Sequence, residues 1–93
     1  MSHIPSKELL EATHSFPCIF TFKAIGLTDS HFEEELLKLF TAELEDPRGR
    51  HSKRVSKDGK HAAITLEIPV GSAEHVIALY SELINLPGLA MVL

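Results

Sequence analysis

The sequence contains one cysteine, no tryptophan and no long run of apolar residues. A single thiol, Cys18, makes no internal disulfide, which excludes a cystine-stapled secreted scaffold and fits a reducing compartment. No segment approaches the roughly 18 apolar residues of a membrane span, and the first twelve residues lack the order of a secretory signal. We therefore expect a cytoplasmic protein with no membrane partner.

Positive charge is also scarce. Nine Lys and Arg residues against thirteen Asp and Glu residues give a net charge of −4, whereas phosphate-dominated binding needs surplus positive charge. We therefore do not expect a nucleic-acid partner. The six histidines have no metal-ligand spacing and only one cysteine to assist them, so we expect neither a metal site nor a cofactor.

Alternating apolar and polar residues predict four strands. The alternation is clearest from Phe16 to Ile25, where Gly26 is expected to end the strand, and in the 60s. Between the second and third strands, Lys57-Asp58-Gly59-Lys60 supplies an Asp-Gly pair that suits a tight primed turn. The expected strands cover residues 16–25, 48–57, 62–69 and 89–93.

Two segments have the apolar period of an amphipathic helix. The first begins at Ser30, which forms a capping-box spacing with Glu33, and it ends before Pro47. The second begins with Ser72 as its N-cap and ends near Pro87. Both helices are expected to bury one apolar stripe against the sheet.

The order of these elements is strand, helix, strand, strand, helix, strand, which predicts an α+β, ferredoxin-like βαββαβ sandwich. Two helices should cover one face of a four-stranded, antiparallel-rich sheet of order 4-1-3-2. The two most apolar strands take the central positions, and the basic strand takes an edge. Residues 16–93 form the single domain, and residues 1–15 form an arm with a short helix at 7–12 capped by Ser6.

The most uneven feature is a basic segment that holds six of the nine cationic residues. Its members are Arg48, Arg50, Lys53, Arg54, Lys57 and Lys60. Two interpretations stay open: a charged edge strand that resists strand addition, or a patch that binds a small anion or an acidic protein surface. The hairpin is expected to bring His51 and His61 near one another, a pair that would suit a metal ion or a pH sensor, although unrelated surface histidines are favoured. An alternative function is that of a small enzyme or carrier that uses the basic edge and His51 or His61 on an anionic substrate.

Several short motifs, taken in order, resemble those of the bacterial YbeD-like proteins, a family of unknown function in which some members carry the label lipoate regulatory protein. The motifs are Phe16-Pro17, Phe20-Thr21-Phe22-Lys23 with Gly26, Ser56-x-x-Gly59 and the triplet Met91-Val92-Leu93. The chain departs from the family at His61, where an aromatic residue is usual, and at Ala63, where a small hydroxyl residue is usual. The resemblance implies a small cytoplasmic protein with a fold similar to ACT-type regulatory domains, which bind amino acids at domain interfaces.

The resemblance also draws attention to the loop from Gly26 to Ser30. In ACT-type domains the corresponding turn contacts an amino-acid ligand, with glycine allowing close backbone approach. Asp29 would then pair with the ligand amine. In the alternative interpretation, Asp29 or Ser30 only caps the following helix.

The outer face of the sheet offers no aromatic platform for RNA bases, and its apolar residues, Ile19, Ile25 and Val55, favour self-association. We therefore expect a homo-oligomer. The sequence as a whole predicts a non-enzymatic regulatory or adaptor module with no assigned catalytic residue. It would act through a protein partner or through a small anionic or amino-acid ligand.

Overall fold

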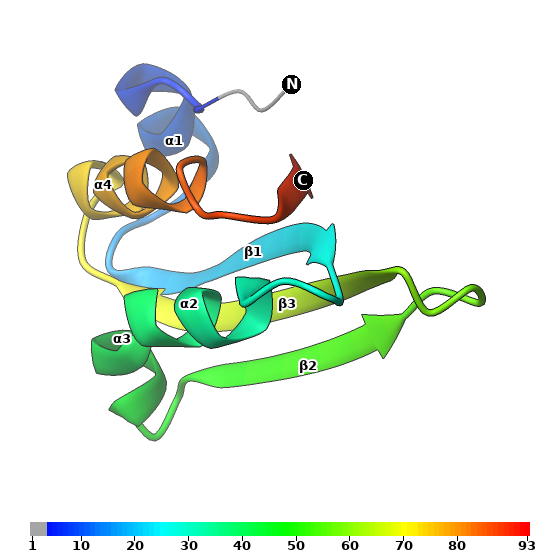
Figure 1. The fold of residues 1–93 in the computed structure, drawn as a ribbon. Helices are drawn as coiled ribbons and strands as arrows, with labels where there is room; N and C mark the ends of the chain where they lie inside the picture. The colour runs from blue at the N-terminus through cyan, green and yellow to red at the C-terminus, as the bar shows by residue number, and fades with distance from the viewer. Residues whose placement is uncertain (1–3) are drawn as a thin grey trace.

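The computed structural model describes residues 4–93 and contains one four-stranded sheet with its helices (Figure 1). The elements, in chain order, are α1 (Lys7–Thr13), β1 (Cys18–Leu27), α2 (Phe32–Leu39), α3 (Thr41–Glu45), β2 (Arg50–Val55), β3 (His61–Val70), α4 (Ala73–Leu83) and β4 (Leu89–Val92).

The sheet has the order β2-β3-β1-β4 with antiparallel neighbours, which confirms the predicted ferredoxin-like arrangement. The two central strands, β1 and β3, pair over ten residues, from Cys18 opposite Val70 to Leu27 opposite His61. Every residue of β2 is exposed, as expected for an edge strand, and the hairpin beyond it projects from the body of the molecule (Figure 1).

Alternation along the central strands places one set of side chains in the core. Phe22, Leu66 and Ile68 are fully buried, and the Phe22 ring lies 5.2 Å from the ring of Phe40 and 4.8 Å from that of Tyr80. These centroid distances are typical of favourable aromatic contacts. The strands thus bury one face against the helices and leave the other to solvent.

The short helix α1 contributes to this core. Its N-cap is Ser6, whose hydroxyl accepts a hydrogen bond from the Leu9 amide at 3.1 Å, as predicted. Leu10 is only 2% exposed and packs in the core cluster, whereas Leu9 is 55% exposed. Leu10 therefore anchors the helix in the core, and Lys7 adds an exposed ion pair with Glu74 of α4 at 2.9 Å.

The prediction of one continuous helix up to Pro47 is wrong, because the chain breaks at Phe40 into α2 and α3. The Thr41 hydroxyl donates to the carbonyl oxygens of Leu37 and Lys38, at 3.2 and 2.8 Å, and so competes for the groups that continue the helix. The break accompanies complete burial of the Phe40 side chain.

The predicted capping box is also wrong. The Ser30 hydroxyl accepts a hydrogen bond from the amide of Phe32 at 3.2 Å and donates to the carbonyl of Leu27 at 2.8 Å. Ser30 therefore ties the end of β1 to the start of α2, but it does not bond to Glu33 in the expected way. The residue directly before the helix is His31, whose side chain forms no cap hydrogen bond.

Gly26 does not end its strand, because β1 continues to Leu27 and Gly26 pairs with Ala62 of β3. Close packing explains why this residue is a glycine. The ring of Phe32 lies where a β-carbon would be placed, so only glycine lets this buried aromatic side chain sit against the strand.

Gly26→Ala should lower the free energy of unfolding by about 1–3 kcal/mol, because the added methyl group must displace the Phe32 ring. Gly71→Ala is the matched control, since nothing lies within 4 Å of the position that its methyl group would take and its φ is unstrained, and its effect should stay within about 1 kcal/mol. Urea denaturation measures both. Equal effects of the two substitutions would contradict this account of Gly26.

Leu10→Ala should cost about 2–5 kcal/mol of stability, because it leaves a cavity in the shared core. Leu9→Ala in the same helix should change stability by less than about 0.5 kcal/mol, since that side chain is exposed. Thermal denaturation of both variants tests whether α1 is bound to the domain. A neutral Leu10 substitution would show that it is not.

Candidate functional site

The loop after β1 is bonded to the β2–β3 hairpin. The Thr28 amide donates to the carbonyl of Lys60 at 3.0 Å, and the Thr28 hydroxyl donates to the carbonyl of Gly59. Gly59 has φ +73°, so a turn is present at the predicted Asp-Gly pair. The predicted primed form is wrong, because Asp58 does not have the positive φ that this form requires. Two segments that lie about thirty residues apart in the sequence are therefore held as one unit.

The side chain of Asp58 forms hydrogen bonds within the hairpin. Its carboxylate accepts hydrogen bonds from the Ser56 hydroxyl at 2.6 Å and from the Lys60 amide at 3.0 Å. The Ser56 hydroxyl in turn accepts the amide of His61 at 3.1 Å. These bonds fix the backbone at Lys60 and His61, two residues of the predicted site.

A hollow of about 370 Å³ lies where the loop meets the hairpin. It is lined by Leu27, Thr28, Asp29, Gly59, Lys60 and His61. Three predicted site residues, Asp29, Lys60 and His61, therefore line one concave surface together. The hollow combines a carboxylate, an ammonium group and an imidazole with the apolar side chain of Leu27, which is 42% exposed.

Gly26 lies outside this hollow. It is buried beneath the ring of Phe32, so the close approach that it permits is to this side chain. Asp29 is exposed, and the amide at the start of α2 is bonded by Ser30 instead. The carboxylate of Asp29 is thus left facing solvent beside the hollow.

The basic segment does not form one patch. Arg48 makes a bidentate ion pair with Asp46 at 3.1 Å, and the guanidinium holds the pKa of this carboxyl below its ordinary value. Lys53 pairs with Glu33 of α2 at 2.6 Å on the helix side of the sheet. Both pairs are solvent-exposed and add little to stability.

The remaining cations of the segment point elsewhere. Arg50 lies opposite Glu67 and Arg54 lies opposite Ala63, both on the outer face of the sheet, and Lys57 is exposed in the hairpin turn. The alternation of β2 therefore divides the charges between its two faces.

The expectation that His51 and His61 lie near one another is wrong. His51 pairs with Leu66 on the helix side of the sheet, whereas His61 lies at the far end of β3 on the outer face. Val55 likewise pairs with the buried Ala62, so it is not part of the outer face. Within residues 4–93 no three His, Cys, Asp or Glu side chains group as metal ligands, and His3 lies outside the described residues.

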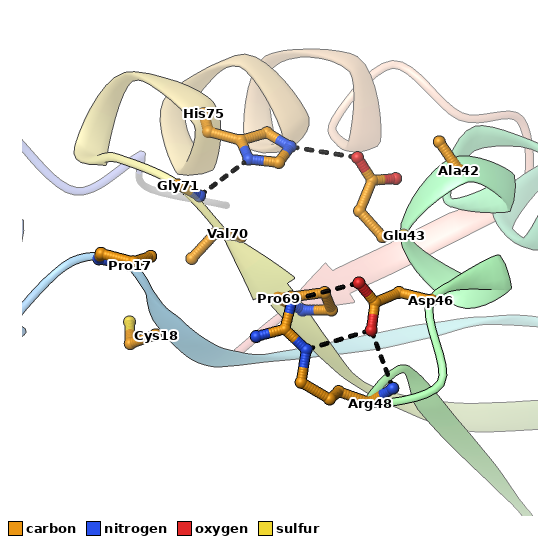
Figure 2. Close-up of a pocket in the computed structure, with 10 residues that line it drawn as sticks. All are labelled: Pro17, Cys18, Ala42, Glu43, Asp46, Arg48, Pro69, Val70, Gly71 and His75. Carbon is orange, nitrogen blue, oxygen red and sulfur yellow. Dashed lines mark hydrogen bonds and ion pairs between the residues drawn. The ribbon is translucent and has the colours of Figure 1, made fainter.

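A second hollow, of about 310 Å³, lies at the other end of the central strands and was not predicted (Figure 2). In it the Nδ1 atom of His75 accepts the Gly71 amide at 3.2 Å, so the ring proton is on Nε2, which donates to Glu43 at 3.0 Å. Both ring nitrogens are thereby occupied. His75 is therefore not free to act as a base on Cys18, which lines the same hollow.

The His75–Glu43 hydrogen bond joins residues 32 positions apart and links α4 to α3. No local sequence pattern signals such a pair, because its spacing depends on how both helices pack. Its role is to connect elements, and the chemistry that its side chains offer a ligand is limited by their engagement with one another.

The sheet order and the helices that cover one of its faces give the chain an ACT-like, ferredoxin-like fold. The structure resembles that of protein HP0495 from Helicobacter pylori, with a TM-score of 0.66, 17% identity, and coverage of 87% of this chain and 86% of the other. It also resembles the ACT domain from the GTP pyrophosphokinase of Chlorobium tepidum, with a TM-score of 0.62, 14% identity, and coverage of 82% and 97%.

The chain belongs to the family described as "Protein of unknown function (DUF493)", whose pattern matches residues 11–93. A UPF0250 protein of Buchnera aphidicola is 32% identical over 87 residues, 94% of this chain and 98% of the relative. A UPF0250 protein of Shewanella oneidensis is 36% identical over 89 residues, 92% of each chain. These findings confirm the resemblance to YbeD-like proteins of ACT-like fold. Among the described residues, no helix is long and apolar enough to cross a membrane.

Ser56→Ala should raise the pKa of Asp58, because the Ser56 hydroxyl is the main cause that holds this pKa below the ordinary carboxyl value. A lowered pKa in the folded state means that Asp58 stabilises the hairpin above the ordinary carboxyl pKa and loses this effect as the pH falls through the folded value. Carbon-detected NMR titration measures the pKa. The internal control is Asp46, whose pKa is lowered by Arg48 and should not change in this variant.

Proposed function

We propose that the protein is a non-enzymatic regulatory module that binds an amino-acid-type ligand in the hollow between the loop after β1 and the hairpin. The observation that carries the proposal is the joint presence of Asp29, Lys60 and His61 around this hollow. The ACT-like fold supports it, because domains of this type bind amino acids. The family is described as of unknown function, so the family comparison does not assign this role.

The chemistry of the hollow suits a zwitterion. The Asp29 carboxylate would accept the ligand ammonium group, and the Lys60 ammonium would donate to the ligand carboxylate. The exposed side chain of Leu27 offers contact to an apolar ligand side chain. His61, half-buried at the end of β3, is placed to add a hydrogen bond.

The enzyme or carrier alternative gains no support from the geometry. It uses the basic edge with His51 or His61, but these histidines lie on opposite faces of the sheet. The cations of β2 are divided between the same two faces, so no single site gathers the whole set. An adaptor that acts through a protein partner is the competing proposal, favoured if no small ligand binds. The cytoplasmic location and the homo-oligomer stay predictions of the sequence.

A thermal-shift screen of the purified protein against the proteinogenic amino acids tests the proposal. A ligand present at 100 times its dissociation constant should add about 2.7 kcal/mol to the free energy of unfolding. Asp29→Asn and Lys60→Gln should each weaken binding about tenfold, because each removes one charge-assisted hydrogen bond.

Glu45→Gln and Lys38→Gln are charge-matched controls on the helices and should leave the shift intact, since both side chains are exposed and lie outside the hollow. The proposal is contradicted if no amino acid stabilises the protein. It is equally contradicted if a stabilising amino acid acts unchanged on the Asp29 and Lys60 variants.

A further inference from the structure

The outer face of the sheet carries a cluster of cations that the proposed function does not use. The inward side chains of β1 and β3 are buried, but their outward neighbours are exposed or half-buried. Lys23 of β1 and Arg54 of β2 are both on this outer face, on either side of β3. The face is therefore open to a ligand.

The strand register sets the neighbours of these cations. Ser52, Thr65 and Lys23 lie side by side across β2, β3 and β1. Arg54 lies in the adjacent row, opposite Ala63. Side chains directly opposite one another in such rows share a face and come within about 5 Å at their β-carbons.

The two rows form a shallow hollow of about 450 Å³. Its lining residues are Lys23, Ser52, Lys53, Arg54, Ala63 and Thr65. The small residues Ala63 and Thr65 lie on the middle strand, and the long cationic side chains lie on the strands that flank it. Two strand spacings separate β1 from β2 by about 10 Å. A Lys side chain from β1 and an Arg side chain from β2 are long enough to reach the same ligand over β3.

Four polar side chains of the hollow, those of Lys23, Ser52, Arg54 and Thr65, have no side-chain partner among the described residues. Within residues 4–93, Lys23 and Arg54 form no ion pair, unlike Lys53, whose ammonium is paired with Glu33. Over the same residues, the hydroxyls of Ser52 and Thr65 form no side-chain hydrogen bond. Two positive charges and two hydroxyl donors therefore surround one hollow.

The acidic residue of β3 does not neutralise this cluster. Glu67 lies one row further along the outer face, opposite Arg50 and Thr21. It is not among the residues that line the hollow. The local charge is thus positive, although the chain as a whole carries −4.

We propose that this hollow is a binding site for a doubly charged oxyanion, as in a phosphate group or a dicarboxylate. Lys23 and Arg54 supply one positive charge each, and the hydroxyls of Ser52 and Thr65 donate to the remaining oxygens. Arg54 adds a planar fork that matches either group. This hollow shares no lining residue with the hollow of Asp29 and Lys60, although His61 of that hollow and Ala63 of this one are alternate residues of β3.

Amide-detected NMR titration of the whole chain tests this site with inorganic phosphate and with succinate, each as the dianion at constant ionic strength. Saturable shifts should concentrate at Lys23, Ser52, Arg54 and Thr65 with at least one of the two probes. Phosphate alone would identify a phosphate site, and succinate alone a dicarboxylate site. Acetate and chloride at equal ionic strength should give no saturable shift, because each carries a single charge.

Lys23→Gln and Arg54→Gln should each weaken the binding about tenfold. The double variant Lys38→Gln/Lys57→Gln matches the net charge of Lys23→Gln/Arg54→Gln, lies outside the hollow and should bind as the unmodified protein does. The proposal is overturned if neither dianion gives saturable shifts at these residues. It is also overturned if the two double variants lose affinity equally, since binding would then follow only net charge.

Discussion

The ten-residue antiparallel pairing of β1 with β3 is the constraint on which the rest of the structure depends. Because side chains alternate along a strand, its register decides which residues enter the core and which face solvent. It places Phe22 and Leu66 beneath the helices, and Lys23 and Thr65 on the open face. A slip by one residue would exchange the two sets.

The same pairing positions both candidate sites. It ends with Leu27 opposite His61, so the loop after β1 meets the hairpin and Thr28 can bond to Gly59 and Lys60. It also sets β2 and β1 on either side of β3, which brings cations from distant parts of the sequence over small central residues. The two sites differ in charge: one combines an acid with a base, and the other holds cations and hydroxyls.

Much of the fold could be predicted because its signals are local. The alternation of apolar and polar residues predicts the strands, and Asp58-Gly59 predicts the position of the hairpin. The high charge of the second strand predicts that it lies at an edge of the sheet. The apolar period does not predict the helix break at Phe40, because a period does not record how the Thr41 hydroxyl bonds to the carbonyls of Leu37 and Lys38. Closeness in sequence predicts one basic cluster, but a strand sends successive residues to opposite faces of the sheet. No local pattern links Lys23 to Arg54, because only the strand register places both on the outer face on either side of β3.

The most direct test of the account is a measurement of nuclear Overhauser contacts between β1 and β3. We expect cross-strand contacts that join Phe22 to Leu66 and Lys23 to Thr65, with the second pair accessible to a soluble paramagnetic probe and the first pair protected from it. Contacts displaced by one residue, or protection of Lys23 and Thr65 together with exposure of Phe22 and Leu66, would contradict the register and with it both sites.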